Sequence, residues 1–170
     1  VQHPERGRLK QIMKNSDGLA GFHLDIGTPK RLVFAEAPID LMSYYELHKD
    51  NLEDVRLVAM EGLKKGVISR YTVDLLSDGQ YSQTMSREQI IGALDALNQT
   101  TELLKDSSNL ITLAVDNDEA GLRFINGLKD DGIPITVDIP PRKDNQDKMD
   151  WNEYLKKEKA GEKQMAEESS

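Results

Sequence analysis

The stretch that decides the fold reads NLITLAVDNDEAG and covers residues 109–121. Its first part, Leu110 to Val115, is almost wholly apolar, as in a strand that is covered on both faces of a sheet. The strand ends in Asp-Asn-Asp and is followed by small residues that suit the start of a helix. Open α/β sheets place their sites at this carboxyl end of the strands. The stretch therefore predicts a buried strand that delivers two carboxylates to the functional edge of a sheet.

These two carboxylates belong to Asp116 and Asp118, which point the same way if the chain is extended. Carboxylates that converge repel each other unless one is protonated or a cation lies between them. One interpretation is therefore a hard divalent cation bound through oxygen, with Mg²⁺ the expected ion. The other is a polar loop in which Asp118 caps a helix that begins near Glu119. The two residues alone leave both interpretations open.

The composition excludes several classes of site. The chain has 170 residues, enough for one domain with a substantial core. It has no cysteine, which excludes disulfides, thiolate metal sites and cysteine nucleophiles, and its three histidines are too widely spaced for a histidine-rich zinc site. The 22 basic and 30 acidic residues give a net charge of −8. The chain therefore lacks the basic excess of a protein that binds nucleic acid through surface charge alone.

We expect a cytoplasmic domain that has been excised from a longer protein. No apolar run approaches the roughly 18 to 20 residues that span a bilayer, and no signal peptide is visible. The chain begins at Val1 rather than at a methionine, and residues 1–18 are polar and charged. We interpret residues 1–18 as a lead-in from a parent chain, whose other domains are expected partners.

Strands alternate with helices along the rest of the chain, which predicts an α/β fold. Residues 20–26 alternate in polarity and lead through a Gly-Thr-Pro-Lys turn to an apolar strand at 31–35, which predicts an N-terminal β-hairpin. Further apolar runs at 55–60, 110–115 and 135–139 are separated by helical patterns. This order predicts a mostly parallel, four-stranded central sheet with helices on both faces.

The expected helices cover residues 38–49, 86–104, 119–130 and a segment that begins near Asp150. We expect the domain to extend from residue 19 to residue 158. Within it the weakly patterned residues 64–85 suggest an insertion that contains a small helix or a hairpin, and the charged residues 159–170 suggest a flexible tail.

Acidic residues recur at the carboxyl ends of the predicted strands. Glu36 ends one strand, Asp116 and Asp118 follow another, and Asp150 comes after the loop that follows the last strand. Pro38 suits the first turn of a helix, so Glu36 would face a helix N-terminus that favours an anion. In a parallel sheet these ends share one edge, where crowded carboxylates cost stability unless a cation binds. The pattern therefore strengthens the metal interpretation.

Three segments together resemble the Toprim domain of bacterial-type primases, type IA and type II topoisomerases, nucleases and recombination-repair proteins. They read EAPID at residues 36–40, DNDEAG at residues 116–121 and DWNEYL at residues 150–155. The resemblance covers roughly Arg31 to Leu155 and is greatest to the primase-type Toprim domains of plasmids and conjugative elements. It implies a Rossmann-like Toprim fold and Mg²⁺-dependent, or alternatively Mn²⁺-dependent, phosphodiester chemistry.

The resemblance also implies roles for individual acids. Asp116 and Asp118 match the metal-binding pair of the family, and Glu36 matches its catalytic glutamate, a general acid or base that in some members is also a metal ligand. Asp40 matches a family acidic position and is either an outer acid of the site or merely an acid favoured in the first turn of its helix. Asp150 is either an outer acid or the N-cap of its helix.

The sequence departs from the family in two places. Ala37 stands where the family commonly has glycine after the glutamate, and residues 64–85 are longer than the usual connection. The implied partners are DNA, expected to be single-stranded, and nucleotides. Lys64, Lys65 and Arg123 are candidate contacts to phosphate, although each by itself is more typical of solvated surface charge.

The leading hypothesis is a Toprim domain of a larger primase-like nucleotidyltransferase that makes primers for a mobile element. A Toprim nuclease is the alternative within enzymes. A topoisomerase is less favoured, because no tyrosine of the chain lies in a recognisable nucleophile motif. The non-enzymatic alternative is a docking module of a replication or recombination assembly, which the net negative charge favours mildly.

Overall fold

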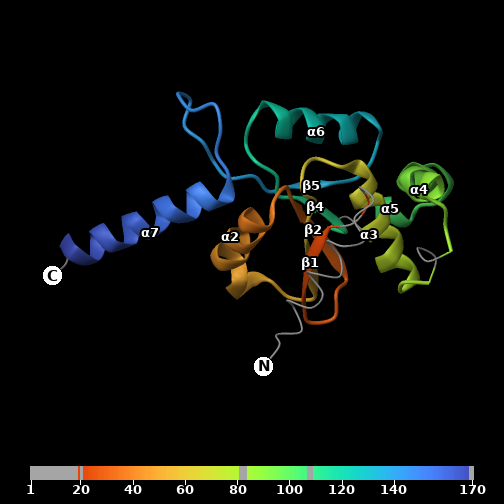
Figure 1. Ribbon diagram of the computed structural model, residues 1–170, viewed down its shortest axis with the longest axis horizontal. Coiled ribbons are helices and arrows are strands. Elements are labelled where there is room, and N and C mark those ends of the chain that lie inside the picture. The colour runs from red at the N-terminus through yellow and green to blue at the C-terminus, as the bar shows by residue number, and fades with distance from the viewer. Residues whose placement is uncertain (1–18, 20, 81–83, 107–108, 169–170) are drawn as a thin grey trace.

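The computed structural model describes residues 19, 21–80, 84–106 and 109–168, in which five strands form one sheet (Figure 1). The strands are β1 (Phe22–Ile26), β2 (Arg31–Ala35), β3 (Val55–Ala59), β4 (Ile111–Leu113) and β5 (Thr136–Val137). Their order across the sheet is β1-β3-β2-β4-β5. Neighbouring strands from β3 to β5 are parallel, whereas β1 runs antiparallel to β3 at one edge. The predicted α/β class and the mostly parallel sheet are confirmed.

The sheet has five strands rather than four, and the predicted N-terminal hairpin is wrong. Strand β1 pairs with β3 and not with its sequence neighbour β2. Both edges of β2 are already taken by β3 and β4, and its apolar side chains from Leu32 to Ala35 are buried in the cores on the two faces of the sheet. The turn after β1 is held by Asp54, whose side chain accepts from the Thr28 amide and whose carbonyl accepts from the Lys30 amide.

Helices cover both faces of the sheet, as predicted. They are α2 (Pro38–His48), α3 (Lys65–Ser77), α4 (Arg87–Thr100), α5 (Leu103–Asp106), α6 (Glu119–Asp130) and α7 (Trp151–Glu168), with a 3₁₀ turn at Lys49–Asn51. Two apolar cores result. Helices α3 to α6 share a core with one face, whereas Leu41 and Tyr44 of α2 and Trp151 of α7 share a core with the other. Figure 1 shows α2 and α7 on the side of the sheet opposite α3 and α4.

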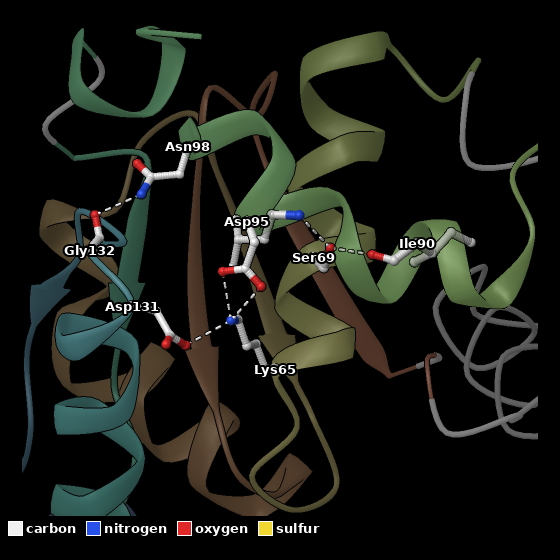
Figure 2. Close-up of polar contacts among 8 residues, drawn as sticks. Lys65, Ser69, Ile90, Asp95, Asn98, Asp131 and Gly132 are labelled. Carbon is white, nitrogen blue, oxygen red and sulfur yellow. Dashed lines mark hydrogen bonds and ion pairs between the residues drawn. The ribbon is translucent and has the colours of Figure 1, made fainter. Parts of the chain in front are cut away.

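Residues 64–85, the expected insertion, contain a core helix. Val67 and Ile68 of α3 are fully buried against the sheet. The Ser69 hydroxyl ties α3 to α4, because it donates to the carbonyl of Ile90 and accepts from the amide of Leu94 (Figure 2). Of the small helix and the hairpin considered for this segment, the structure has a helix, and it packs in the core of the domain.

The chain ends were expected to carry little structure. Residues 1–18 lie outside the described residues. Helix α7 continues to Glu168, so residues 159–168, for which a flexible tail was predicted, are helical. Figure 1 shows its far end projecting from the body of the molecule, and residues 156–163 are exposed. No helix among the described residues has both the length and the apolar character of a membrane span.

Helix α6 starts in very close contact with the end of β4, and Gly121 makes this possible. A Cβ atom at Gly121 would lie 2.1 Å from the backbone oxygen of Asp116, far inside van der Waals contact. The amide of Gly121 also donates to Oδ1 of Asp118, at 2.7 Å. The small residue after the acidic pair thus fixes where α6 begins relative to the strand that precedes it.

We predict that Gly121→Ala lowers the free energy of unfolding by about 2 kcal/mol or more, because backbone atoms must move apart to admit the methyl group. Gly127→Ala is the matched control in the same helix. A Cβ atom at Gly127 has no neighbour within 4 Å, and alanine is the better helix former by up to about 1 kcal/mol. Urea unfolding of both variants tests the contact, and equal stabilities would refute it.

Candidate metal centre

Glu36 extends from the end of β2 and is fixed by the two neighbouring strands. After β3 the chain turns back through Glu61 and Gly62, both at positive φ, and the Gly62 amide donates to the carbonyl of Glu36 at 3.1 Å. On the other side, Oε2 of Glu36 accepts a hydrogen bond from the backbone amide of Asp116, at 3.0 Å. The side chain at the end of β2 is therefore bound to the backbone just beyond β4.

The structure brings the three predicted ligands together. One carboxylate oxygen from each of Glu36, Asp116 and Asp118 can be chosen so that all three lie within 4.8 Å of one another. Asp116 is 6% exposed, and its Oδ1 atom is buried without a hydrogen-bond partner. A buried oxygen that accepts nothing costs free energy unless a cation or proton reaches it. Because oxygen is the donor that Mg²⁺ and Mn²⁺ prefer, these three side chains fit a hard divalent cation.

Asp118 caps α6 and also lies in the acidic cluster. Its Oδ1 atom accepts the Gly121 amide and caps α6, with the extended backbone of an N-cap residue. A carboxylate has a second oxygen, and Asp118 remains a member of the acidic cluster with Glu36 and Asp116. Capping therefore orients the side chain of Asp118 at the cluster and does not compete with a metal role.

The crowding of acids raises the pKa of two buried carboxyls. Burial, then a hydrogen bond to Glu36 that only the protonated form of Asp116 can donate, and the negative charge of Glu36 raise the pKa of Asp116 well above its ordinary value. Burial, followed by the charge of Asp116, raises the pKa of Asp40 to about 6. Both shifts mean that the folded protein disfavours the ionised forms, and a bound cation would offset this cost.

Asp40 and Asp150 lie beside the cluster and hold the start of α7. The backbone amide of Asn152 donates to Oδ1 of Asp40, at 3.2 Å, and the Glu153 amide donates to Oδ1 of Asp150, at 2.8 Å. Asp150 is therefore the N-cap of α7, one of its two predicted roles. Its charge nevertheless raises the pKa of Asp40 and Asp116.

Ala37 causes no strain at the position where the family commonly has glycine. Its backbone is extended, with φ −127° and ψ 154°, a conformation that any residue adopts. Pro38 then begins α2 in the place predicted for it. The departure from the family pattern thus leaves the position of Glu36 intact.

The three candidate phosphate contacts have other neighbours in the structure. The Lys65 ammonium bridges Asp95 of α4 and Asp131, each at 2.8 Å, which ties α3 to both segments (Figure 2). Arg123 pairs with Glu119 one turn earlier on the exposed surface of α6, and Lys64 is the residue before α3. None of the three forms an ion pair with Glu36, Asp116 or Asp118 in the described part of the chain. Lys65 thus joins α3 to two other segments, and a phosphate contact by any of the three residues stays a prediction.

Sequence reasoning missed Lys148, the basic residue that does contact the cluster. Its Nζ atom lies 3.5 Å from Oδ2 of Asp116. The segment before α7 is attached to the strand end by a pair of backbone hydrogen bonds between Asn117 and Met149, and by the Trp151 indole, which donates to the Ala114 carbonyl. The sequence gives no signal for this contact beyond the place of Lys148 two residues before Asp150.

The raised pKa of Asp40 predicts how stability depends on pH. The pKa of Asp40 is about 6 in the folded protein, above the ordinary 3.8. The contribution of Asp40 to stability is therefore fully present below pH 3.8 and is lost as the pH rises through 6. Asp40→Asn, which keeps an oxygen for the Asn152 amide, should therefore stabilise the metal-free protein at pH 8 by about 1–2 kcal/mol.

This gain should shrink as the pH falls from 8 to 4.5. Urea unfolding in EDTA at both pH values measures it, with Asp144→Asn, an exposed carboxyl of the loop before α7, as the control of equal charge. A gain that does not change with pH would contradict the assignment.

Comparison with known proteins gives the family. Residues 72–155 match the Toprim-like family, a range that contains Asp116, Asp118 and Asp150 but begins after Glu36. The chain is 34% identical over 161 residues to an uncharacterized protein of Bacillus anthracis, pXO2-78, whose name refers to the plasmid pXO2. This alignment covers 90% of the chain but 40% of the relative, so the chain spans about two fifths of that protein's length. No solved structure matches the chain. The protein therefore carries a Toprim-like domain and has a plasmid-encoded relative.

Proposed function

We propose that this domain supports metal-dependent phosphodiester chemistry on nucleic acid, and specifically nucleotidyl transfer during primer synthesis by a larger protein of a mobile element. The observation that carries the proposal is the convergence of Glu36, Asp116 and Asp118 around a buried carboxylate oxygen that has no hydrogen-bond partner. Toprim domains bind a divalent metal, usually Mg²⁺, and act on nucleic acid, which supports the same conclusion. The proposed partners are single-stranded DNA, nucleotides and other domains of the parent chain, in the cytoplasm.

Asp116 and Asp118 would hold the cation, with Glu36 as a third ligand. A bound Mg²⁺ or Mn²⁺ would neutralise charge on a phosphate and orient it for in-line displacement. The hydrogen bond from the Asp116 amide fixes one oxygen of Glu36. The carboxyl group of Glu36 would pass a proton to or from the 3′-oxygen of the nucleic acid, as a general base or acid.

Asp40 and Asp150 would act by positioning. Asp40 joins the first turn of α2, which follows Glu36, to the first turn of α7, and Asp150 caps that same turn. Both carboxyls therefore fix the position of the segment before α7 relative to the acidic cluster of Glu36, Asp116 and Asp118. Their charges add to the negative potential that attracts a cation.

A Toprim nuclease is the second candidate, because the same three carboxylates would serve hydrolysis if water replaced the 3′-hydroxyl as the attacking group. Incubation with a single-stranded DNA template and Mg²⁺ separates the two functions. Primer synthesis requires nucleoside triphosphates and gives new strands, whereas a nuclease shortens the template without them. Nucleic-acid binding with neither product would favour a docking module.

Asp118→Asn should abolish the Mg²⁺-dependent reaction while it leaves the fold intact. Asparagine caps helices as well as aspartate does, so α6 keeps its start, but the amide lacks the charge that a hard cation requires. Product formation is measured for the variant and for Asp144→Asn, which removes an exposed charge outside the cluster. Unfolding curves for both should match the parent chain. Full activity of Asp118→Asn would refute the proposed function.

A further inference from the structure

Lys148 lies beside the acidic cluster, and hydrogen bonds hold its backbone in place. Its neighbour Met149 is buried and exchanges two backbone hydrogen bonds with Asn117, at 2.8 and 3.0 Å. The Asn117 side chain also donates to the carbonyl of Pro140, at 2.9 Å, so both ends of the loop before α7 are attached beside the acidic pair. The backbone at Lys148 is therefore fixed, whereas its side chain is 58% exposed.

The Lys148 ammonium faces acids that follow β4 and an acid at the start of α7. Its nearest partner is Asp116, at 3.5 Å, and the charges of Asp118 and Asp150 also act on it. Its positive charge in turn opposes the rise in pKa of Asp116 and Asp40. In the absence of a metal, Lys148 is thus the cation that partly neutralises the buried carboxylate of Asp116.

A purely structural role for this ion pair is weak. Pairs that involve an exposed lysine contribute little to stability, because solvent screens them and the long side chain loses freedom. The fold of the loop depends instead on the Asn117 and Met149 backbone pair and on the buried Trp151. A flexible ammonium is, however, well suited to bind a phosphate as a mobile point charge.

We propose that Lys148 is a phosphate-binding residue of the site, which releases Asp116 when a divalent cation binds and then contacts the nucleic-acid phosphate held at that cation. This inference rests on the proposed metal centre. The same ammonium thus has two partners in turn, a carboxylate without metal and a phosphate with it. It follows that Lys148 competes with the metal but cooperates with the nucleic acid.

These opposite signs give the test, in which the Lys148→Met variant is compared with the parent chain in two titrations. Calorimetric titration with Mg²⁺ alone should show affinity about threefold higher in the variant, since the competing charge is gone. Binding of a fluorescein-labelled oligothymidylate, with Ca²⁺ in place of Mg²⁺ to suppress cleavage, should show weaker binding. Its salt dependence should be shallower by about 0.7 in the slope of log K against log salt, the loss of one single-strand phosphate contact. Lys148→Arg should restore that slope.

Lys143→Met is the matched control, because it removes an equal charge from the same exposed loop and should leave the Mg²⁺ affinity unchanged. If Lys148→Met weakened Mg²⁺ binding, or left both titrations as in the parent chain, the inference would be overturned while the metal centre stood. If the parent chain bound no Mg²⁺ at all, the proposed function would fail, and the inference with it.

Discussion

The hydrogen bond from the Asp116 amide to Glu36 is the contact on which the site depends. It joins the ends of two parallel strands that lie 80 residues apart in the chain. Because a backbone amide is the donor, the bond holds Glu36 in place without using the Asp116 side chain. That side chain is left to face Glu36 and Asp118, with one oxygen buried and unpartnered. The close approach of Gly121 to the same residue then fixes α6 and the cap that orients Asp118.

This arrangement places carboxylates where they repel one another. Burial and mutual charge raise the pKa of Asp116 and Asp40, so the metal-free fold is less stable when both are ionised. Other contacts of the fold offset this loss of stability. They are the two buried cores and the attachment of the loop to the strand end through Met149 and Trp151. A cluster that costs stability and is still held in place by several separate contacts is better explained by cation binding than by the needs of the fold.

Much of this could be predicted from local sequence patterns. Apolar runs located the parallel strands, the capping box at Ser86 located α4, and the ends of the strands indicated Glu36, Asp116 and Asp118. The partner of β1 could not be predicted, because alternation of polar and apolar residues identifies an edge strand but not its neighbour. A small helix or a hairpin was considered for residues 64–85, but the core position of α3 was not predicted, because its apolar residues form only a weak pattern between Gly66 and Gly79. Lys65 and Lys148 look alike in the sequence, and only tertiary contacts separate the cation that joins helices from the one that faces the acids.

The central claim is that Glu36, Asp116 and Asp118 together form a site for one divalent cation. Electron paramagnetic resonance of Mn²⁺ tests it directly, because the six-line signal of the free ion loses intensity when the ion is bound. The account predicts that the folded protein reduces this signal with saturation near one ion per chain, and that Asp116→Asn, folded to the same extent, leaves the signal of free Mn²⁺ unchanged. Equal loss of signal with the parent chain and with Asp116→Asn would contradict the account.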